Sequence, residues 1–414
     1  MSSGGRVSGE GVLELLGRVL PRERVDHFAA QSGLPACALA APSTFDEAAE
    51  VVRLARAERW KVVPVGNASK LGWARPPERC DLVLSSRNLR GITAYEPADG
   101  TLTALAGTPW SELVAATSAR HHLSPEIPAA ERASLGGVLA AGASGLDRLR
   151  HGPLRHQVLG MLALVADGTR VKSGGRVVKN VTGYDLHRLW CGSHGTLCFL
   201  LEATLGLYPA PAALAVLEAR CASLAEGLAR SHALWRAGVQ PLCVVLRGAQ
   251  ASFELAVVLA GRDEAVASEL ETARAALGPA ELRLGDDARR ARVELRECEL
   301  ASGAWPALVL ACRPSRLASA LERLGRVTNE LGLSTRLLCH PLLASAAVEL
   351  PGVEWSDEHV AALERGLVGD GLELRWRGLG VRTPPMRTPP AAAELMRRIK
   401  QSLDPEGLFA RALP

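Results

Sequence analysis

Residues 62–73, VVPVGNASKLGW, decide how this chain folds. The first four are apolar and mostly β-branched, which is typical of a buried strand, and Gly66 ends that run. Small residues follow, so a bound anion can approach the backbone, and Lys70 can add a positive charge there. Taken alone, the stretch is more often a structural turn than an anion site.

A capped helix is expected directly before this strand. Ser43 or Thr44 can cap it, and Asp46 and Glu47 suit its positive first turn. Residues 11–34 indicate a short helix and a connector behind a flexible tail at 1–10. Further along, apolar runs between turn signals predict strands at 81–86, 91–97, 101–106 and 196–209, a helix at 110–120, a hairpin at 161–175 and a long irregular stretch at 121–160. A loop of that length is usually functional.

Two later segments also have the composition of a ligand site. Residues 131–145, ERASLGGVLAAGASG, form either a small-residue helix packed on a sheet or backbone laid against an extended ligand. Residues 174–209 place many polar side chains beside apolar runs, which is typical of a site lining, although a solvated face would have the same composition. The order and spacing of the three segments are more specific than any one of them.

Together, the three segments resemble the FAD-binding domain of the vanillyl-alcohol oxidase / p-cresol methylhydroxylase (PCMH-type) flavoprotein superfamily, over about residues 38–209. The family's pyrophosphate loop, Gly-Gly segment, K-N-x-x-G-Y-D-L box and G-S-x-G-T-L-G strand correspond to residues 66–70, 134–137, 179–186 and 192–198. Within that superfamily the chain resembles the FAD-binding E subunits of bacterial glycolate oxidase. Their tail pattern, K-Q-x-L-D-P-x-G-x-F, corresponds to residues 400–409.

The resemblance implies FAD held without a covalent bond. The loop would bind the pyrophosphate, the Gly-Gly segment would approach the pyrophosphate and ribityl chain, and the later residues would lie near the flavin or adenine. Lys179 could pair with a phosphate or with Asp185. The implied cofactor-binding residues are Gly66, Asn67, Ala68, Ser69, Lys70, Ser134, Gly136, Gly137, Gly142, Ser144, Lys179, Phe199 and Leu200.

Several departures from the family pattern affect the functional prediction. Cys198 replaces the last Gly of the strand motif, and FARA at 409–412 replaces the usual F-N-P-G ending. Related catalytic subunits carry a metal-binding histidine cluster in their second half, but only His340 and His359 follow residue 232 here. We therefore expect no metal site, and the catalytic residues stay unknown. The histidines in the motif segments, more often loop residues than flavin-side groups, are His151, His156 and His194.

A composition shift at 209–213 predicts a domain boundary. Downstream, strands at 242–246, 253–259, 307–312 and 335–339 alternate with helices at 264–277, 314–332 and 357–367, which predicts an α+β unit with its sheet covered on one face. A Pro-rich linker, TPPMRTPP, precedes a last amphipathic helix at 391–403. The predicted division is a tail and helix (1–37), a PCMH-type FAD-binding domain of two α+β subdomains (38–209) and a smaller cap-like α+β domain (210–414).

Composition excludes several classes of protein. The 414 residues include 48% hydrophobic and 22% charged residues, as in ordinary globular domains. A net charge of +4 is too balanced for a nucleic-acid binder. The nine cysteines form no CxxC pair, so no iron–sulfur or zinc site is predicted from them, and an odd number without a signal peptide indicates reduced thiols. No apolar run reaches transmembrane length.

The sequence thus predicts a FAD-binding oxidoreductase subunit of a glycolate oxidase/dehydrogenase-like complex that acts on 2-hydroxy acids. A catalytic flavoprotein and an iron–sulfur subunit are the expected partners. We expect a cytoplasmic protein that associates with the inner face of the membrane, if at all, through those partners. Two alternatives stay open: a standalone FAD-dependent enzyme acting on another alcohol, and a non-catalytic assembly subunit.

Overall fold

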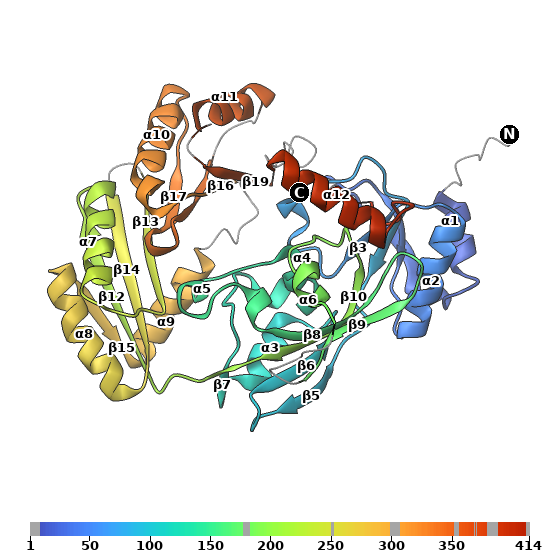
Figure 1. Ribbon diagram of the computed structural model, residues 1–414, viewed down its shortest axis with the longest axis horizontal. Coiled ribbons are helices and arrows are strands. Elements are labelled where there is room, and N and C mark those ends of the chain that lie inside the picture. The colour runs from blue at the N-terminus through green and yellow to red at the C-terminus, as the bar shows by residue number, and fades with distance from the viewer. Residues whose placement is uncertain are drawn as a thin grey trace.

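Three large sheets organise the chain, as the computed structural model shows (Figure 1). The structure describes residues 9–176, 183–249, 252–298, 307–351, 356–367, 369, 371–378 and 388–410. Lys179, most of the predicted tail and most of TPPMRTPP lie outside these residues. Helices and sheets are mixed throughout, in agreement with the predicted α+β class.

The first sheet has the order β1-β2-β4-β3. Its strands β2, β4 and β3 are parallel, and β1 is antiparallel to β2. As predicted, Thr44 caps the helix before β3, and Glu47 completes a capping box. β1 lies where only a connector is predicted. The elements are α1 (Gly9–Leu16), β1 (Val25–Phe28), β2 (Cys37–Ala40), α2 (Phe45–Ala57), β3 (Val62–Val65) and β4 (Leu82–Ser85).

The second sheet is antiparallel, in the order β5-β6-β10-β8-β9. Its strands are β5 (Ile92–Glu96), β6 (Thr101–Leu105), β8 (Val158–Leu164), β9 (Arg170–Gly174) and β10 (Phe199–Gly206). The stretch 121–160, predicted to be irregular, contains several short elements. The elements between and after the strands are α3 (Trp110–Thr117), β7 (His121–His122), α4 (Leu135–Ala141), α5 (Arg148–His151), α6 (Leu186–Trp190) and β11 (Tyr208–Pro209), which pairs with β7.

The third sheet is antiparallel and has eight strands in the order β15-β12-β14-β13-β17-β18-β16-β19. The strands are β12 (Ala213–Cys221), β13 (Cys243–Ala249), β14 (Ser252–Gly261), β15 (Glu281–Leu284), β16 (Ala307–Ala311), β17 (Arg336–His340), β18 (Ser345–Glu349) and β19 (Glu373–Arg377). The helices among them are α7 (Leu224–Arg236), α8 (Asp263–Leu277), α9 (Gly285–Glu297), α10 (Leu317–Glu330) and α11 (Asp357–Leu367).

Helices cover both faces of this third sheet, so the expectation of one covered face is wrong. Along β12, Leu217 belongs to a core that includes residues of α7, α8, α10 and α11. Its neighbour Val216 points the other way, because strand side chains alternate, and packs in a cluster with Ala291 and Leu295 of α9. Leu146, from the first half of the chain, joins that second cluster.

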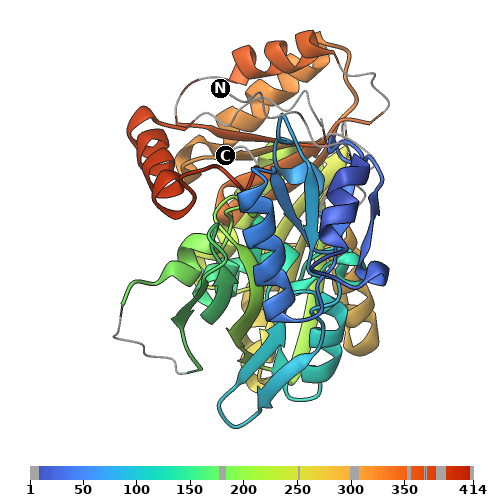
Figure 2. The same ribbon diagram turned by 90° about the vertical axis from the view of Figure 1, so that its right-hand side faces the viewer.

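The end of the chain returns to the first sheet. After the third sheet, α12 (Pro390–Leu403) lies apart from that sheet, on the side of α4 and β3 (Figures 1 and 2). Val62 donates its N–H to the carbonyl of Leu408 (2.8 Å), and Ala410 donates to the carbonyl of Val62 (2.9 Å). Phe409 is buried, so this tail packs against the protein although the N-P-G that usually follows this Phe in the family is absent. The predicted 210–414 unit therefore contains a segment that packs against the 38–209 unit.

A buried ion pair holds this tail in place. The Asp404 carboxylate is buried and accepts hydrogen bonds from the N–H groups of Leu408 (2.8 Å) and Phe409 (2.9 Å) and from the Lys400 ammonium. The same ammonium donates to the carbonyls of Thr196 (2.6 Å) and Phe409 (2.9 Å). The pair thus connects α12, the tail and the loop before β10.

Asp404→Asn is expected to lower the free energy of unfolding by about 3 kcal/mol, because it leaves the Lys400 ammonium largely buried without its counter-charge. Denaturant unfolding followed by circular dichroism at pH 7 measures the change. Glu406→Gln is the matched control: its ion pair with Arg56 is half exposed, so the loss should stay below about 1 kcal/mol. Equal losses in the two variants would contradict this role for Asp404.

Candidate functional site

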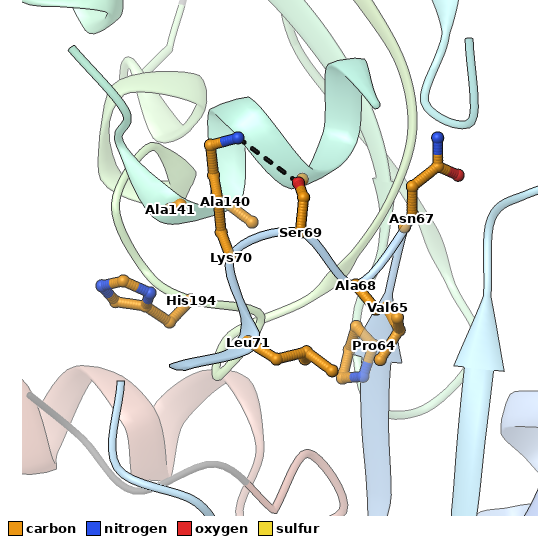
Figure 3. A pocket seen from close by; sticks show the side chains of 12 residues that line it. Pro64, Val65, Asn67, Ala68, Ser69, Lys70, Leu71, Ala140, Ala141 and His194 are labelled. Atoms are coloured by element: carbon orange, nitrogen blue, oxygen red, sulfur yellow. Dashed lines mark hydrogen bonds between the residues drawn. The ribbon is translucent and has the colours of Figure 1, made fainter. Parts of the chain in front are cut away.

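A hollow of about 400 Å³ opens at the carboxyl end of β3. One wall is the loop that follows this strand, and the opposite wall is α4 together with His194 (Figure 3). The lining residues are Pro64, Val65, Gly66, Asn67, Ala68, Ser69, Lys70, Leu71, Gly137, Ala140, Ala141 and His194. Residues of all three segments selected from the sequence therefore line the hollow, with His194 as the contribution of the third segment, 174–209.

The loop fits α4 closely because Gly66 has no side chain. A Cβ at Gly66 would lie 1.9 Å from the Oγ of Ser134. That hydroxyl is already in use, since it accepts a hydrogen bond from the N–H of Gly137 (3.3 Å) at the N-cap of α4. Ala68 adopts a left-handed φ of 60°, so the loop curls tightly after Gly66. Loop and helix therefore form one fitted unit.

Lys70 is a buried cation in the wall of this hollow. Its side chain is buried, and Nζ lies 3.4 Å from Ser69 Oγ (Figure 3). No carboxylate pairs with it in the part of the chain that the structure describes. Burial, followed by the positive charges of Arg377 and Arg132, lowers the pKa of Lys70 to about 8. A buried ammonium without an acid favours an anionic ligand, because the ligand would supply the missing counter-charge.

The third sheet contributes a second cation to the rim of the site. Arg377 ends β19, and its guanidinium lies 3.8 Å from the ring centroid of Trp73, with Lys70 Nζ 5.5 Å from the same centroid. Gly378 donates its N–H to the carbonyl of Gly72 (2.9 Å), which joins this edge strand to the loop. The sequence analysis missed Arg377 and also Arg132. No local signal marks Arg377, which is about 300 residues away along the chain, whereas Arg132 lies within the selected segment 131–145.

Six of the thirteen predicted cofactor-binding residues line the hollow, and six others among the described residues lie elsewhere. Gly136 faces away from it: a Cβ there would lie 3.0 Å from Ala106. Gly142 caps the end of α4 against Gly192. Phe199 and Leu200 are buried in two different cores, on opposite faces of β10. Ser134 supports the loop from behind, Ser144 is half-buried outside the hollow, and Lys179 lies outside the described residues.

Cys198 and His194, which were also singled out from the sequence, have ordinary structural surroundings. Cys198 is buried in the core of the second sheet, and burial raises the pKa of its thiol. His194 has a left-handed φ of 52° and donates its N–H to the carbonyl of Ala140 (2.7 Å), which joins it to α4. The same holds for His121, which no sequence motif singles out: its Nδ1 lies 2.8 Å from the hydroxyl of Tyr95. These contacts explain the three residues without a ligand.

Comparison with known proteins identifies a FAD binding domain at residues 36–174, where the chain matches the family model of that description. The chain is 36% identical over 195 residues to glycolate oxidase subunit GlcE of Escherichia coli, covering 47% of this chain and 54% of that protein. It is 34% identical over 170 residues to D-lactate dehydrogenase of Archaeoglobus fulgidus and 30% over 175 residues to glycolate oxidase subunit GlcD of Bacillus subtilis. These two matches cover 41% and 42% of this chain and 38% and 37% of the relatives, so the chain spans about half or less of the curated relatives it matches.

Solved structures extend the likeness to nearly the whole chain. p-Cresol methylhydroxylase superposes with a TM-score of 0.77 at 14% identity, over 98% of this chain and 97% of that one. Alkyldihydroxyacetonephosphate synthase gives 0.72 at 13% identity, over 97% and 84%. The chain therefore contains a FAD-binding domain and has the p-cresol methylhydroxylase fold. Both the predicted fold class and the predicted cofactor are confirmed.

The residues of the hollow fit the phosphate end of FAD. A pyrophosphate needs a close approach to backbone N–H groups and positive charge nearby, and residues 66–70 with Lys70 offer both. Lys70 would hold the anion, and Gly137 would leave room for it beside α4. When bound, the flavin supplies the redox chemistry, while the protein supplies binding and orientation.

The affinity for FAD is expected to fall as the pH rises above about 8. A bound pyrophosphate would raise the pKa of Lys70 above its value of about 8 in the free protein, so binding takes up a proton at higher pH. The dissociation constant should therefore increase about tenfold between pH 7 and 9. Flavin fluorescence titration measures it. A pH-independent constant, or the same increase in Lys70→Met, would contradict the assignment to Lys70.

Proposed function

We propose that this protein is a FAD-dependent oxidoreductase that oxidises 2-hydroxy acids, as a subunit of a glycolate oxidase/dehydrogenase-like complex. The observation that carries this proposal is the buried, unneutralised Lys70 in the loop of a FAD-binding domain. The 36% identity to glycolate oxidase subunit GlcE supports the substrate class. The FAD would be bound without a covalent bond, and Gly66, Asn67, Ala68, Ser69, Lys70 and Gly137 would form the pyrophosphate site.

Electrons would leave this chain for a partner. The cysteine spacing contains no iron–sulfur motif, so a cluster would belong to a separate subunit. A catalytic flavoprotein would be the second partner, with this chain relaying electrons. No helix among the described residues is long and apolar enough to cross a membrane. As a further part of the proposal, the complex would be cytoplasmic, with any attachment to the inner face of the membrane made through the partners.

The test combines cofactor content with partner content. The chain, expressed with its neighbouring genes and purified through a tag, should contain one FAD per chain, released by acid precipitation, and should bring iron with it. Glycolate or D-lactate should reduce an artificial dye in the presence of the complex. Colourless protein that does not bind added FAD would contradict the proposal.

The same experiment separates the two alternatives. Dye reduction by the isolated chain with another alcohol, and no response to glycolate, would favour a standalone enzyme. Full activity of the complex after Lys70→Met has removed FAD from this chain would favour an assembly subunit. The proposed subunit requires both FAD on this chain and the partner for 2-hydroxy-acid oxidation.

A further inference from the structure

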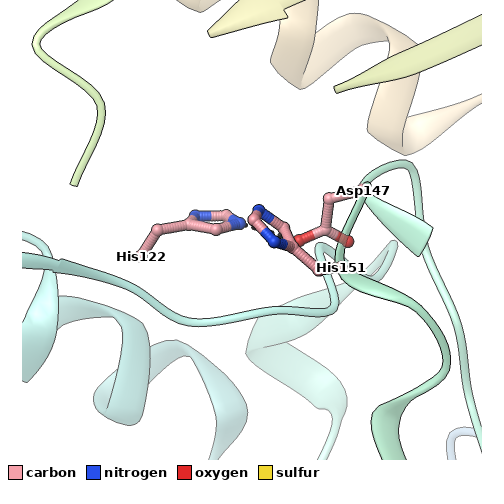
Figure 4. Close-up of side chains that lie close together, drawn as sticks. All are labelled: His122, Asp147 and His151. Carbon is pink, nitrogen blue, oxygen red and sulfur yellow. Dashed lines mark hydrogen bonds and ion pairs between the residues drawn. The ribbon is translucent and has the colours of Figure 1, made fainter. Parts of the chain in front are cut away.

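Away from the hollow, three side chains with metal-ligating atoms converge at the junction between the second and third sheets. His122, Asp147 and His151 each offer one nitrogen or oxygen atom, and these three atoms lie within 4.8 Å of one another (Figure 4). His122 Nε2 lies 2.7 Å from Asp147 Oδ2, and the two imidazole centroids are 5.5 Å apart. None of the three belongs to the residues proposed to bind FAD.

Local structure brings these residues together from two parts of the chain. His122 is on β7, which pairs with β11 so that Tyr208 lies opposite it. Asp147 is the N-cap of α5, and His151 is the last residue of this one-turn helix, so the two are one turn apart on the same side. His122 and Asp147 are 25 residues apart, so spacing along the sequence does not show this cluster. The expectation of no metal site rests on the second half of the chain, where only His340 and His359 follow residue 232.

Surrounding contacts fix the orientation of these side chains. Asp147 is fully buried, and its Oδ1 accepts the backbone N–H of Glu126 (2.9 Å). The His151 ring stacks on the Tyr208 ring with their centroids 3.8 Å apart. Ligands held in this way are typical of metal sites, where contacts around the first ligands orient them. His122 is partly exposed, at 13%, so the cluster is accessible from outside.

We propose that His122, Asp147 and His151 bind one divalent transition-metal ion, with Zn²⁺ the best match. Two imidazoles and one carboxylate are ordinary zinc ligands, and a site with three protein ligands leaves the fourth position for water. Bonds of about 2.0–2.1 Å would place the ligand atoms about 3.3 Å apart. The ion would therefore replace the His122–Asp147 hydrogen bond and draw His151 inward by about 1 Å.

The charges around the cluster leave Asp147 available to a cation. Arg292 and Arg150 add positive charge near His151. Arg292 Nε is paired with Glu126 Oε2 (2.6 Å), and Arg150 donates to the carbonyls of Gln240 (3.2 Å) and Ala260 (2.9 Å). Among the ion pairs of the described residues, Asp147 has only His122 as its partner. An ion at this point would give the buried carboxylate a full counter-charge.

The ion would also strengthen the contact between the two halves of the chain. Leu146 packs against the third sheet, and Arg150 donates to the carbonyls of Ala260 in β14 and of Gln240, which precedes β13. The proposal does not depend on the FAD site, because metal content and flavin content are separate measurements. Zn²⁺ is therefore expected to raise the midpoint of thermal unfolding of the chelator-stripped protein, whether or not FAD is bound.

The test uses the full-length, chelator-stripped chain titrated with ZnCl₂ in competition with a chromophoric chelator. Wild type should bind one ion per chain tightly. His151→Gln should weaken this binding at least a hundredfold, and so should Asp147→Asn where it folds. His156→Gln is the control, since it removes an exposed histidine five residues along the chain and should leave the site unchanged.

Cobalt substitution provides the second readout. Co²⁺ in the wild-type chain should give the visible absorption of a four-coordinate site, and His151→Gln should lose that spectrum while its circular dichroism stays native. Two results would overturn the proposal: no ion bound at one per chain, or the same affinity and spectrum in His151→Gln. Either would reduce the cluster to a hydrogen-bonded His–Asp pair.

Discussion

Lys70→Met should weaken FAD binding about a hundredfold while the protein stays folded. A hydrogen bond to a charged group contributes about 1.5–3 kcal/mol, and every 1.4 kcal/mol is a factor of ten in affinity. Met keeps the length and apolar contacts of the side chain but removes the one ammonium among the described residues that line the hollow. Because Lys70 has no acidic partner in the described part of the chain, its removal leaves no buried carboxylate unpaired. The free protein should therefore unfold at the same or a slightly higher denaturant concentration.

The opposite signs of these two effects make the test specific. Fluorescence titration with FAD measures the affinity, and denaturant unfolding of the flavin-free protein measures stability. Lys172→Met is the matched control, since Lys172 is an exposed residue of β9 outside the hollow and should bind FAD normally. Unchanged affinity in Lys70→Met, or a loss shared equally by both variants, would remove Lys70 from the site.

Local signals predicted the first half of the fold well. The capping residues of α2, the apolar run of β3 and the signals for the hairpin predicted at 161–175 each lie within a few residues of the element they define. The long stretch 121–160 was harder, because its short helices depend on tertiary contacts. For example, glycines let α4 pack closely between Ala106 and the loop that follows β3. The helical periodicity of the sequence alone does not show which neighbour each glycine faces.

At the candidate site, too, the sequence predicted local segments but not their tertiary contacts. Sequence motifs identified the loop and the Gly-Gly segment, but not that Gly137 faces the hollow while Gly136 faces Ala106. Arg377 and the returning tail at Phe409 reach the first sheet from the far end of the chain. Their positions follow from the packing of the third sheet and α12, for which residues 62–73 carry no information.

Gly66→Ala is expected to abolish FAD binding and to destabilise the protein. The new Cβ would lie 1.9 Å from Ser134 Oγ and 3.2 Å from Ser134 Cβ, so rotation of the hydroxyl alone does not relieve the contact. Either the loop moves away from α4, or the Ser134 side chain rotates and loses the hydrogen bond that it accepts from the N–H of Gly137. Loss of this N-cap hydrogen bond costs about 1 kcal/mol. With overpacking included, the free energy of unfolding should fall by about 2 kcal/mol. The first route separates the two walls of the hollow, and the second removes the N-cap of the helix that forms one of them.

A second substitution tests this geometry directly. Ser134→Gly removes both atoms that the new Cβ would meet, so the double variant Gly66→Ala/Ser134→Gly should be more stable than the two single effects predict. Gly72→Ala is the control in the same loop, because its Cβ would lie at an ordinary 3.7 Å from Gly378. Flavin content and denaturant unfolding are measured for all four variants. If Gly66→Ala keeps its flavin, or if the stability losses of the two single variants simply add, the close fit between the loop and α4 does not form the site. If the double variant regains stability but not flavin binding, the cofactor itself lies against Gly66.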